Sequence, residues 1–130
     1  MSADAARIAA AAVAEDGDAD VTTAVTVPPG LQAEGIIEYR SGGVLAGIAY
    51  ADAVARACTC SIDWRAQEGC TVDPGTVIGV LHGALDRILR AERPMLNLLQ
   101  RACGIATATR AYVDAVAGTR CRILHTRKTA

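Results

Sequence analysis

AERPMLNLLQRACGIATATRAYVDAVA, residues 91–117, predicts one long helix. Its apolar side chains recur close to one helical face, at Leu96, Leu99, Cys103, Ala106, Val113 and Val116. Pro94 sets the predicted start, because a proline deep inside a helix costs about 3 kcal/mol, whereas in the first turn its missing N–H costs nothing. The sequence therefore predicts a helix that begins near Ala91 and ends at Gly118, with Gly104 as a point where it could break or kink.

The residues on either side of this helix show helical and strand patterns in turn. Two alanine-rich segments without breakers predict helices, residues 3–15 and 50–57. Three segments between glycine- or proline-containing turns predict strands, residues 31–39, 61–66 and 76–81. Residues 18–23 are expected to form a polar loop and residues 120–124 a strand. Residues 85–90 could form either a strand or a helix. This order predicts an α+β fold in which helices pack on an antiparallel sheet as a sandwich.

The composition fits one domain with a core of small and aliphatic side chains. Of the 130 residues 52% are hydrophobic, yet the chain has no Phe, one Trp and three Tyr. The net charge is −1, but residues 86–130 carry nine Arg or Lys against three Asp or Glu, while residues 1–85 carry four against eleven. This basic C-terminal part suggests an anionic ligand. Nucleic acid is a poor candidate, since the chain is not basic overall and lacks interleaved aromatic residues.

The cysteines and histidines do not form a metal-binding pattern. The five cysteines are irregularly spaced, and neither His82 nor His125 completes the spacing of a zinc site. Buried free thiols in a reducing cytoplasm are therefore expected. His82 is expected to be packed or solvated, and so is His125, which could alternatively contact a ligand. The apolar run of residues 8–14 is too short to cross a membrane and does not resemble a signal peptide.

Two groups of basic residues are candidates for an anion site. Thr126-Arg127-Lys128-Thr129 contains the only lysine of the chain, and its donors suit carboxylate or phosphate oxygens. The same residues also fit a solvated basic tail. Arg93 lies at the predicted helix N-terminus, where free N–H groups and the helix dipole favour anions. Arg93 also fits an ordinary surface ion pair with a carboxylate one turn away.

Several motifs recur together along the chain in the order of one known family. They are GVLAG (43–47), EG (68–69), PG (74–75), ERPMLNLLQR (92–101), GIAT (104–107), YV (112–113) and TRKT (126–129), with ED (15–16) and DVTT (20–23) upstream. In combination they resemble quinolinate phosphoribosyltransferase (nicotinate-nucleotide pyrophosphorylase). Pro94 and His125 depart from the usual pattern, since the family more often has a small polar or β-branched residue and an aspartate there.

The resemblance implies an enzyme of de novo NAD biosynthesis. Such enzymes transfer phosphoribosyl from phosphoribosyl pyrophosphate to quinolinate with Mg²⁺, giving nicotinate mononucleotide, CO₂ and pyrophosphate. They form homodimers in which both subunits contribute to each site. By resemblance Arg93 reaches the partner subunit's quinolinate, and Thr126, Arg127 and Lys128 bind substrate at the end of the first barrel strand. No nucleophilic catalytic residue is expected, because ribosyl transfer depends on positioning and electrostatics.

The resemblance also implies a division of the chain. Residues 1–117 would form the N-terminal α/β sandwich, and residues 118–130 would begin a C-terminal α/β barrel whose first strand stays out of the sandwich's sheet. A barrel needs about 250 residues, so the chain is expected to be an N-terminal fragment, inactive alone, with the Mg²⁺ ligands outside it. Two alternatives stay open: a related phosphoribosyltransferase acting on another ring acid, and a non-catalytic binding module.

Overall fold

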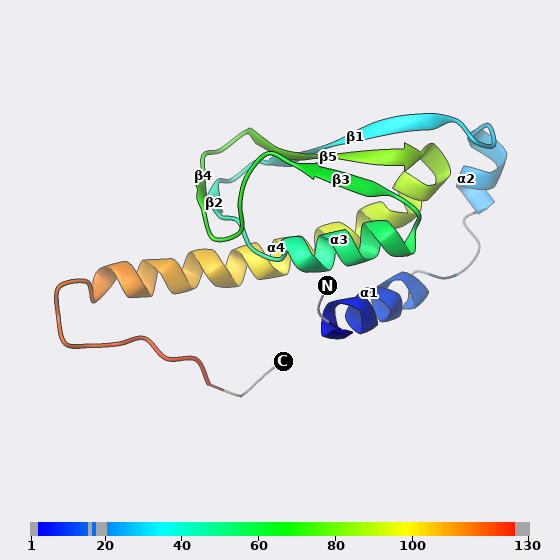
Figure 1. The fold of residues 1–130 in the computed structure, drawn as a ribbon. Helices are drawn as coiled ribbons and strands as arrows, with labels where there is room; N and C mark the ends of the chain where they lie inside the picture. Colours follow the sequence, from blue (N-terminus) through cyan, green and yellow to red (C-terminus); the bar gives the residue numbers. More distant parts are fainter. Residues whose placement is uncertain (1–2, 16, 18–20, 127–130) are drawn as a thin grey trace.

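The computed structural model describes residues 3–15, 17 and 21–126. The elements in chain order are α1 (Ala3–Glu15), α2 (Val21–Thr26), β1 (Gln32–Tyr39), β2 (Gly43–Val44), α3 (Ile48–Ala57), β3 (Ser61–Trp64), β4 (Thr71–Val72), β5 (Thr76–Ala84) and α4 (Leu85–Ala115). Figure 1 shows a layer of strands lying over a layer of helices. The predicted α+β fold with an antiparallel sheet is thereby confirmed.

The main sheet has three strands in the order β1-β5-β3, so that the longest strand lies in the centre. Leu81 of β5 lies opposite Gly35 on one side and Ile62 on the other. A bulge between Ile37 and Glu38 shifts the register of β1 against β5. The short strands β2 and β4 form a separate antiparallel pair at the end of the sheet (Figure 1).

Small residues allow the helices to pack closely under the sheet. α3 and α4 contact the strands, and α1 packs on the other side of α3 and α4 (Figure 1). Ala51, Ala55 and Ala91 are almost fully buried, as are Ala5 and Ala9 of α1. The largest fully buried side chains are Leu45, Ile78, Val54 and Cys58. The core thus consists of aliphatic side chains, alanines and cysteines, as the composition predicted.

The start of the long helix differs from the prediction. α4 begins at Leu85 directly after β5, so Pro94 lies inside the helix rather than in its first turn. The apolar stripe explains this difference, because the buried side chains Ile88, Ala91, Met95, Leu99 and Cys103 continue across the proline at helical spacing. Burial of this stripe therefore outweighs the loss of one helical hydrogen bond at the proline.

Two other segments also differ from their predictions. Residues 21–23 belong to α2, although a polar loop was expected there; residues 18–20 lie outside the described part. Residues 120–124 do not form the predicted strand, and residues 121–126 follow an exposed, irregular path. Ile123 and Leu124 favour a strand, but a strand needs a neighbour to pair with. The prediction that residues 120–126 stay out of the main sheet is confirmed.

The second half of α4 extends away from the domain. Cys103 is the last buried residue of this helix, and residues 108–115 are all exposed. Figure 1 shows this half running past β2 and β4, after which the chain turns back. Gly104 does not interrupt the helix. The exposed half carries three large hydrophobic side chains, Ile105, Tyr112 and Val113.

Candidate functional site

Arg93 is exposed and lies well inside α4. The helix begins at Leu85, about 12 Å along the axis from Arg93. The prediction that Arg93 lies at a helix N-terminus is therefore wrong, because the six residues before Ala91 are helical. The free N–H groups of the helix start are too distant to support an anion there. Any anion at Arg93 would have to be held by side chains.

A cleft of about 380 Å³ lies beside Arg93 between α1 and α4. Its lining residues are Ala12 and Glu15 from α1 and Arg93, Pro94, Asn97 and Leu98 from α4. The guanidinium offers planar paired donors and the Asn97 amide adds one more group that can donate. The Glu15 carboxylate in the same cleft opposes a bound anion. This arrangement suits an arginine that contacts a ligand held mainly by other residues.

The other predicted site residues follow the far end of α4. Thr126 is exposed and ends the irregular segment of residues 121–126, and His125 is exposed beside it. Arg127 and Lys128 lie outside the described residues. Between Arg93 and Ala115, the last residue of α4, the helix runs for about 33 Å. Arg93 thus lies on the half of α4 that packs on the domain, and Thr126 follows the half that extends from it.

The motifs at residues 43–47, 68–69 and 104–107 meet at one place in the fold. The backbone N–H of Val44 donates to Oγ1 of Thr107 over 2.8 Å. The N–H of Ala46 donates to Sγ of Cys103 over 3.3 Å. The carboxylate of Glu68 accepts from the N–H of Gly47. Residues 43–47, which comprise β2 and the loop that follows it, are therefore fixed both to α4 and to the turn before β4.

Sequence reasoning missed the role of Tyr39 and Thr107 in this cluster. Burial raises the pKa of the Tyr39 phenol, a hydrogen bond with Thr107 lowers it again in part, and Cys103 adds to the rise. Tyr39 also donates to the carbonyl oxygen of Val44 over 3.4 Å. The adjacent glycines 42 and 43 could have indicated this contact, since residues without a side chain allow the backbone to approach another element closely.

His82 lies between two carboxylates of the sheet, and the cysteines are free thiols. His82 is half-buried on the sheet, with Nδ1 3.4 Å from Oε1 of Glu34 and Nε2 3.2 Å from Oδ2 of Asp63. The expectation that His82 is packed or solvated is confirmed. All five cysteines are free thiols, of which Cys58, Cys60 and Cys103 are buried.

Neither a metal centre nor a membrane span is found in residues 3–15, 17 and 21–126. In these ranges no group of three or more His, Cys, Asp or Glu side chains could hold a metal ion. Likewise, no helix in them is both long enough and apolar enough to cross a bilayer. The residues described do not fit a magnesium site.

The antiparallel sheet on a layer of helices, with the motifs gathered at one end of it, defines a small α+β domain, and comparison with known proteins places it in a family. Residues 20–103 match the model of the family described as quinolinate phosphoribosyl transferase, N-terminal domain. The chain therefore belongs to the quinolinate phosphoribosyl transferase family.

Curated relatives and solved structures agree with this family. The nicotinate-nucleotide pyrophosphorylase [carboxylating] of Mycobacterium leprae is 40% identical over 85% of this chain and 40% of its own length. The chloroplastic protein of that name from Oryza sativa is 41% identical over 92% of this chain and 33% of its own length. A structure of NadC from Streptococcus pyogenes matches with a TM-score of 0.88 and 29% identity over 95% of this chain and 46% of that one. The chain thus spans less than half of the relatives it matches.

Proposed function

We propose that this chain supplies the N-terminal part of a quinolinate phosphoribosyltransferase. In the reaction of such an enzyme, the ring nitrogen of quinolinate attacks C1 of the ribose of phosphoribosyl pyrophosphate and displaces pyrophosphate. The ring carbon next to this nitrogen then loses its carboxylate as CO₂ and takes up a proton from solvent, which gives nicotinate mononucleotide, a compound of pyridine nucleotide biosynthesis. The main support for the proposal is that residues 20–103 match the model of this family. The proposal also includes a substrate-binding role for Arg93, Thr126, Arg127 and Lys128.

The chemistry needs positioned positive charge rather than a nucleophile. Quinolinate carries two adjacent carboxylates, and the exposed Arg93 guanidinium can bind one of them through paired hydrogen bonds. Because the N-terminus of α4 is about 12 Å away along the helix, the charge-assisted bonds of Arg93 itself must supply the interaction. Arg127 and Lys128 would neutralise the second carboxylate or the phosphates, and Thr126 would add a hydroxyl.

The proposal includes shared sites in a homodimer. Arg93 lies on the part of α4 that packs on this domain, while Thr126 follows the far end of the same helix. About 33 Å of helix separate Arg93 from Ala115, and the residues that lead from there to Thr126 are irregular and mostly exposed. In a dimer, one chain could contribute Arg93 and the other chain Thr126, Arg127 and Lys128 to the same site. The exposed apolar residues Ile105 and Tyr112 on the extending half of α4 are available for such an assembly.

Mg²⁺ and the location in the cell stay predictions. Mg²⁺ would enter with phosphoribosyl pyrophosphate and offset the charge of the departing pyrophosphate. Since the described residues offer no metal-binding cluster, its protein ligands would lie elsewhere. We derive no step of the reaction through it. A cytoplasmic location is consistent with the free thiols.

A chimaera tests the proposed function. Residues 1–117 of this chain would replace the matching part of the Mycobacterium leprae relative, and nicotinate mononucleotide formed from quinolinate, phosphoribosyl pyrophosphate and Mg²⁺ would be measured. We expect turnover by the chimaera and none by the 130-residue chain alone. Turnover of another ring acid in preference to quinolinate, or a well-folded chimaera without activity, would contradict the proposal.

Arg93→Ala in the chimaera tests the site. It should raise the KM for quinolinate about 10- to 100-fold, as expected for a lost charge-assisted hydrogen bond. Arg110→Ala, at an exposed position further along α4, is the matched control and should change little. A second chimaera that contains all 130 residues would carry Arg127→Ala. Heterodimers of the two variants should regain one intact site, and heterodimers that form without activity would refute the shared site.

A further inference from the structure

Among the described residues, Thr107 is the last residue of α4 whose side chain forms a hydrogen bond with another element of the domain. It is half-buried, and Oγ1 accepts the backbone N–H of Val44 over 2.8 Å. From residue 108 to residue 115 the helix is exposed. Thr109, two residues after Thr107, forms no such bond to another element. Its hydroxyl donates to the carbonyl oxygen of Ile105 in its own helix over 2.7 Å.

Thr107 lies close against the backbone of Gly43. A Cβ added to Gly43 would lie 2.5 Å from Oγ1 of Thr107 and 2.9 Å from the Tyr39 hydroxyl. Gly43 has φ 136°, a conformation that side chains disfavour. The absence of a side chain at residue 43 thus allows the hydroxyl of Thr107 to reach the next amide.

A second attachment one turn earlier fixes the direction of the helix. Cys103 lies four residues before Thr107 and therefore on the same face of α4. Its Sγ accepts the N–H of Ala46 and donates to the carbonyl oxygen of Ala46, both over 3.3 Å. A Cβ on Gly47 would lie 2.8 Å from Cβ of Ala102. Contacts at residues 102, 103 and 107 thus hold one face of α4 against a single loop.

The helix beyond these contacts depends on them. Gly104 lies between the two attachments and weakens a helix by about 1 kcal/mol relative to alanine. Isolated helices shorter than about 12–15 residues are marginal in water. The part of α4 after Thr107 is shorter than this. It therefore depends on the preceding residues of α4, of which Thr107 is the last that is hydrogen-bonded to another element.

We infer that Thr107 is a positioning residue. Its hydrogen bond with Val44 fixes the direction in which α4 leaves the domain, and so the point at the end of α4 from which the chain continues toward Thr126. Thr107 touches no reacting group in this scheme. The catalytic consequence rests on the proposed function, whereas the effect on the helix does not.

Hydrogen exchange in the 130-residue chain tests the effect on the helix. Thr107→Val keeps the shape of the side chain but removes the acceptor of the Val44 N–H. Amides of residues 108–115 should exchange at least about tenfold faster, while those of residues 86–99 stay unchanged. Thr109→Val is the matched control and should have a smaller effect, and Thr107→Ser should restore slow exchange. Equal exchange in Thr107→Val and Thr109→Val would overturn the inference.

Kinetics of the chimaera test the consequence for catalysis. Thr107→Val should lower kcat/KM about 10- to 100-fold at unchanged melting temperature of the barrel, because small misplacements of binding groups have effects of this size. Thr107→Ser should recover most of the loss. A Thr107→Val chimaera that keeps its full kcat/KM would overturn the positioning role. If the unmodified chimaera is inactive, the proposed function fails, and the exchange experiment alone decides the inference.

Discussion

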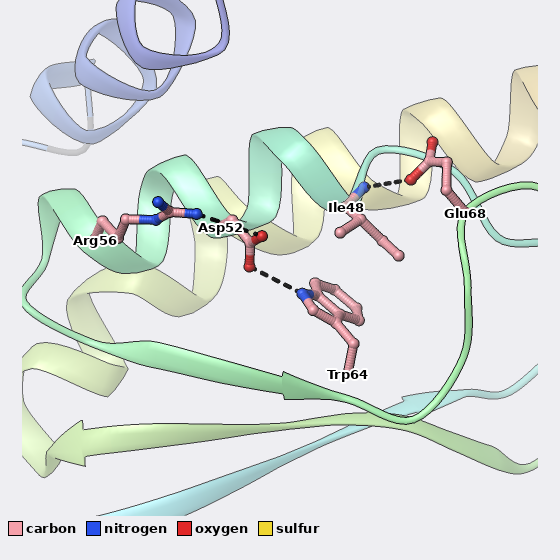
Figure 2. Close-up of polar contacts among 5 residues, drawn as sticks. All are labelled: Ile48, Asp52, Arg56, Trp64 and Glu68. Atoms are coloured by element: carbon pink, nitrogen blue, oxygen red, sulfur yellow. Dashed lines mark hydrogen bonds and ion pairs between the residues drawn. The ribbon is translucent and has the colours of Figure 1, made fainter. Parts of the chain in front are cut away.

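Glu68 caps a helix that begins twenty residues before it in the chain. Its two carboxylate oxygens accept the backbone N–H groups of Gly47, over 2.8 Å, and of Ile48, over 2.9 Å. Figure 2 shows the bond to Ile48 at the first turn of α3. Gly47 is the N-cap residue and has no side chain, so the cap must come from another element. The negative charge also suits the positive end of the helix dipole.

Replacing Glu68 by alanine should destabilise the domain by about 1–2 kcal/mol, because two N–H groups lose their acceptors. Glu68→Gln keeps one acceptor oxygen and should cost roughly half as much. The free energy of unfolding in urea measures both. Glu38→Ala, at an exposed position on β1, is the control and should change stability by no more than about 0.5 kcal/mol. Equal losses at residues 38 and 68 would disprove the cap.

Trp64 reports on a second contact between α3 and the sheet. Its Nε1–H donates to Oδ1 of Asp52 over 2.9 Å, and Oδ2 of Asp52 lies 3.6 Å from the Arg56 guanidinium (Figure 2). Asp52→Ala should cost about 1–2 kcal/mol, since the indole N–H loses a charged acceptor. Arg56→Ala should cost less than about 1 kcal/mol, because the Arg56 side chain is 60% exposed.

The fluorescence of Trp64, the only tryptophan, checks this contact directly. Its emission maximum should move to longer wavelength in Asp52→Ala and stay in place in Arg56→Ala. Asp52→Asn retains an acceptor oxygen and should stay close to the unmodified protein. A shift of similar size in Arg56→Ala would show that the ion pair, rather than the indole hydrogen bond, holds Trp64.

Gly43 should be more sensitive to substitution than Gly69, which also has a positive φ. Gly43→Ala combines an unfavourable φ with a Cβ 2.5 Å from Oγ1 of Thr107, so we expect a loss of about 2–4 kcal/mol. Gly69→Ala is the matched control, because Gly69 has φ 81° but no atom within 4 Å of the added Cβ. It should cost about 1–2 kcal/mol from backbone strain alone. Thermal unfolding compares the two, and equal losses would argue against the close contact with Thr107.

The sequence predicts those parts of the fold that are determined by residues close to one another in the chain. Residues 3–15 are helical with the predicted bounds, and β1 and α3 deviate from theirs by one or two residues. The start of α4 could not be predicted in this way, because burial of Ile88 against the sheet overrides the local preference of Pro94. Residues 120–124 have strand-like side chains, but strand formation depends on a pairing partner that local sequence does not reveal.

The sequence predicted which residues belong to the candidate site, but not where they lie in the fold or what they contact. Arg93 was found from its motif, whereas its place inside α4 required knowledge of where the helix begins. The contact of Val44 with Thr107 joins residues 63 positions apart, and no local pattern marks such a pair. Arg127 and Lys128 stay predictions, since they lie outside the described residues.

The last prediction concerns the pH dependence of stability. Burial raises the pKa of the thiols of Cys58 and Cys60 above their ordinary value of 9.0. For Cys58 the charges of Arg90 and Arg87 oppose the rise in part, and for Cys60 the neighbouring Cys58 adds to it. The two residues are in contact, because Sγ of Cys60 donates to the carbonyl oxygen of Cys58 over 3.6 Å.

Above pH 9.0 the unfolded chain therefore ionises these thiols while the folded protein keeps them neutral. The unfolded state then binds fewer protons, so the free energy of unfolding should fall as the pH rises. Each thiol should contribute up to about 1.4 kcal/mol per pH unit. Urea unfolding between pH 8 and 10 measures this slope. The upper limit stays at pH 10 because the pKa of Tyr39 is also raised by burial from its ordinary 10.0. The variant Cys58→Ala/Cys60→Ala should lower the slope, and Cys121→Ser, which changes an exposed thiol, should leave it unchanged. An unaltered slope in the double variant would mean that other groups cause the loss of stability at high pH.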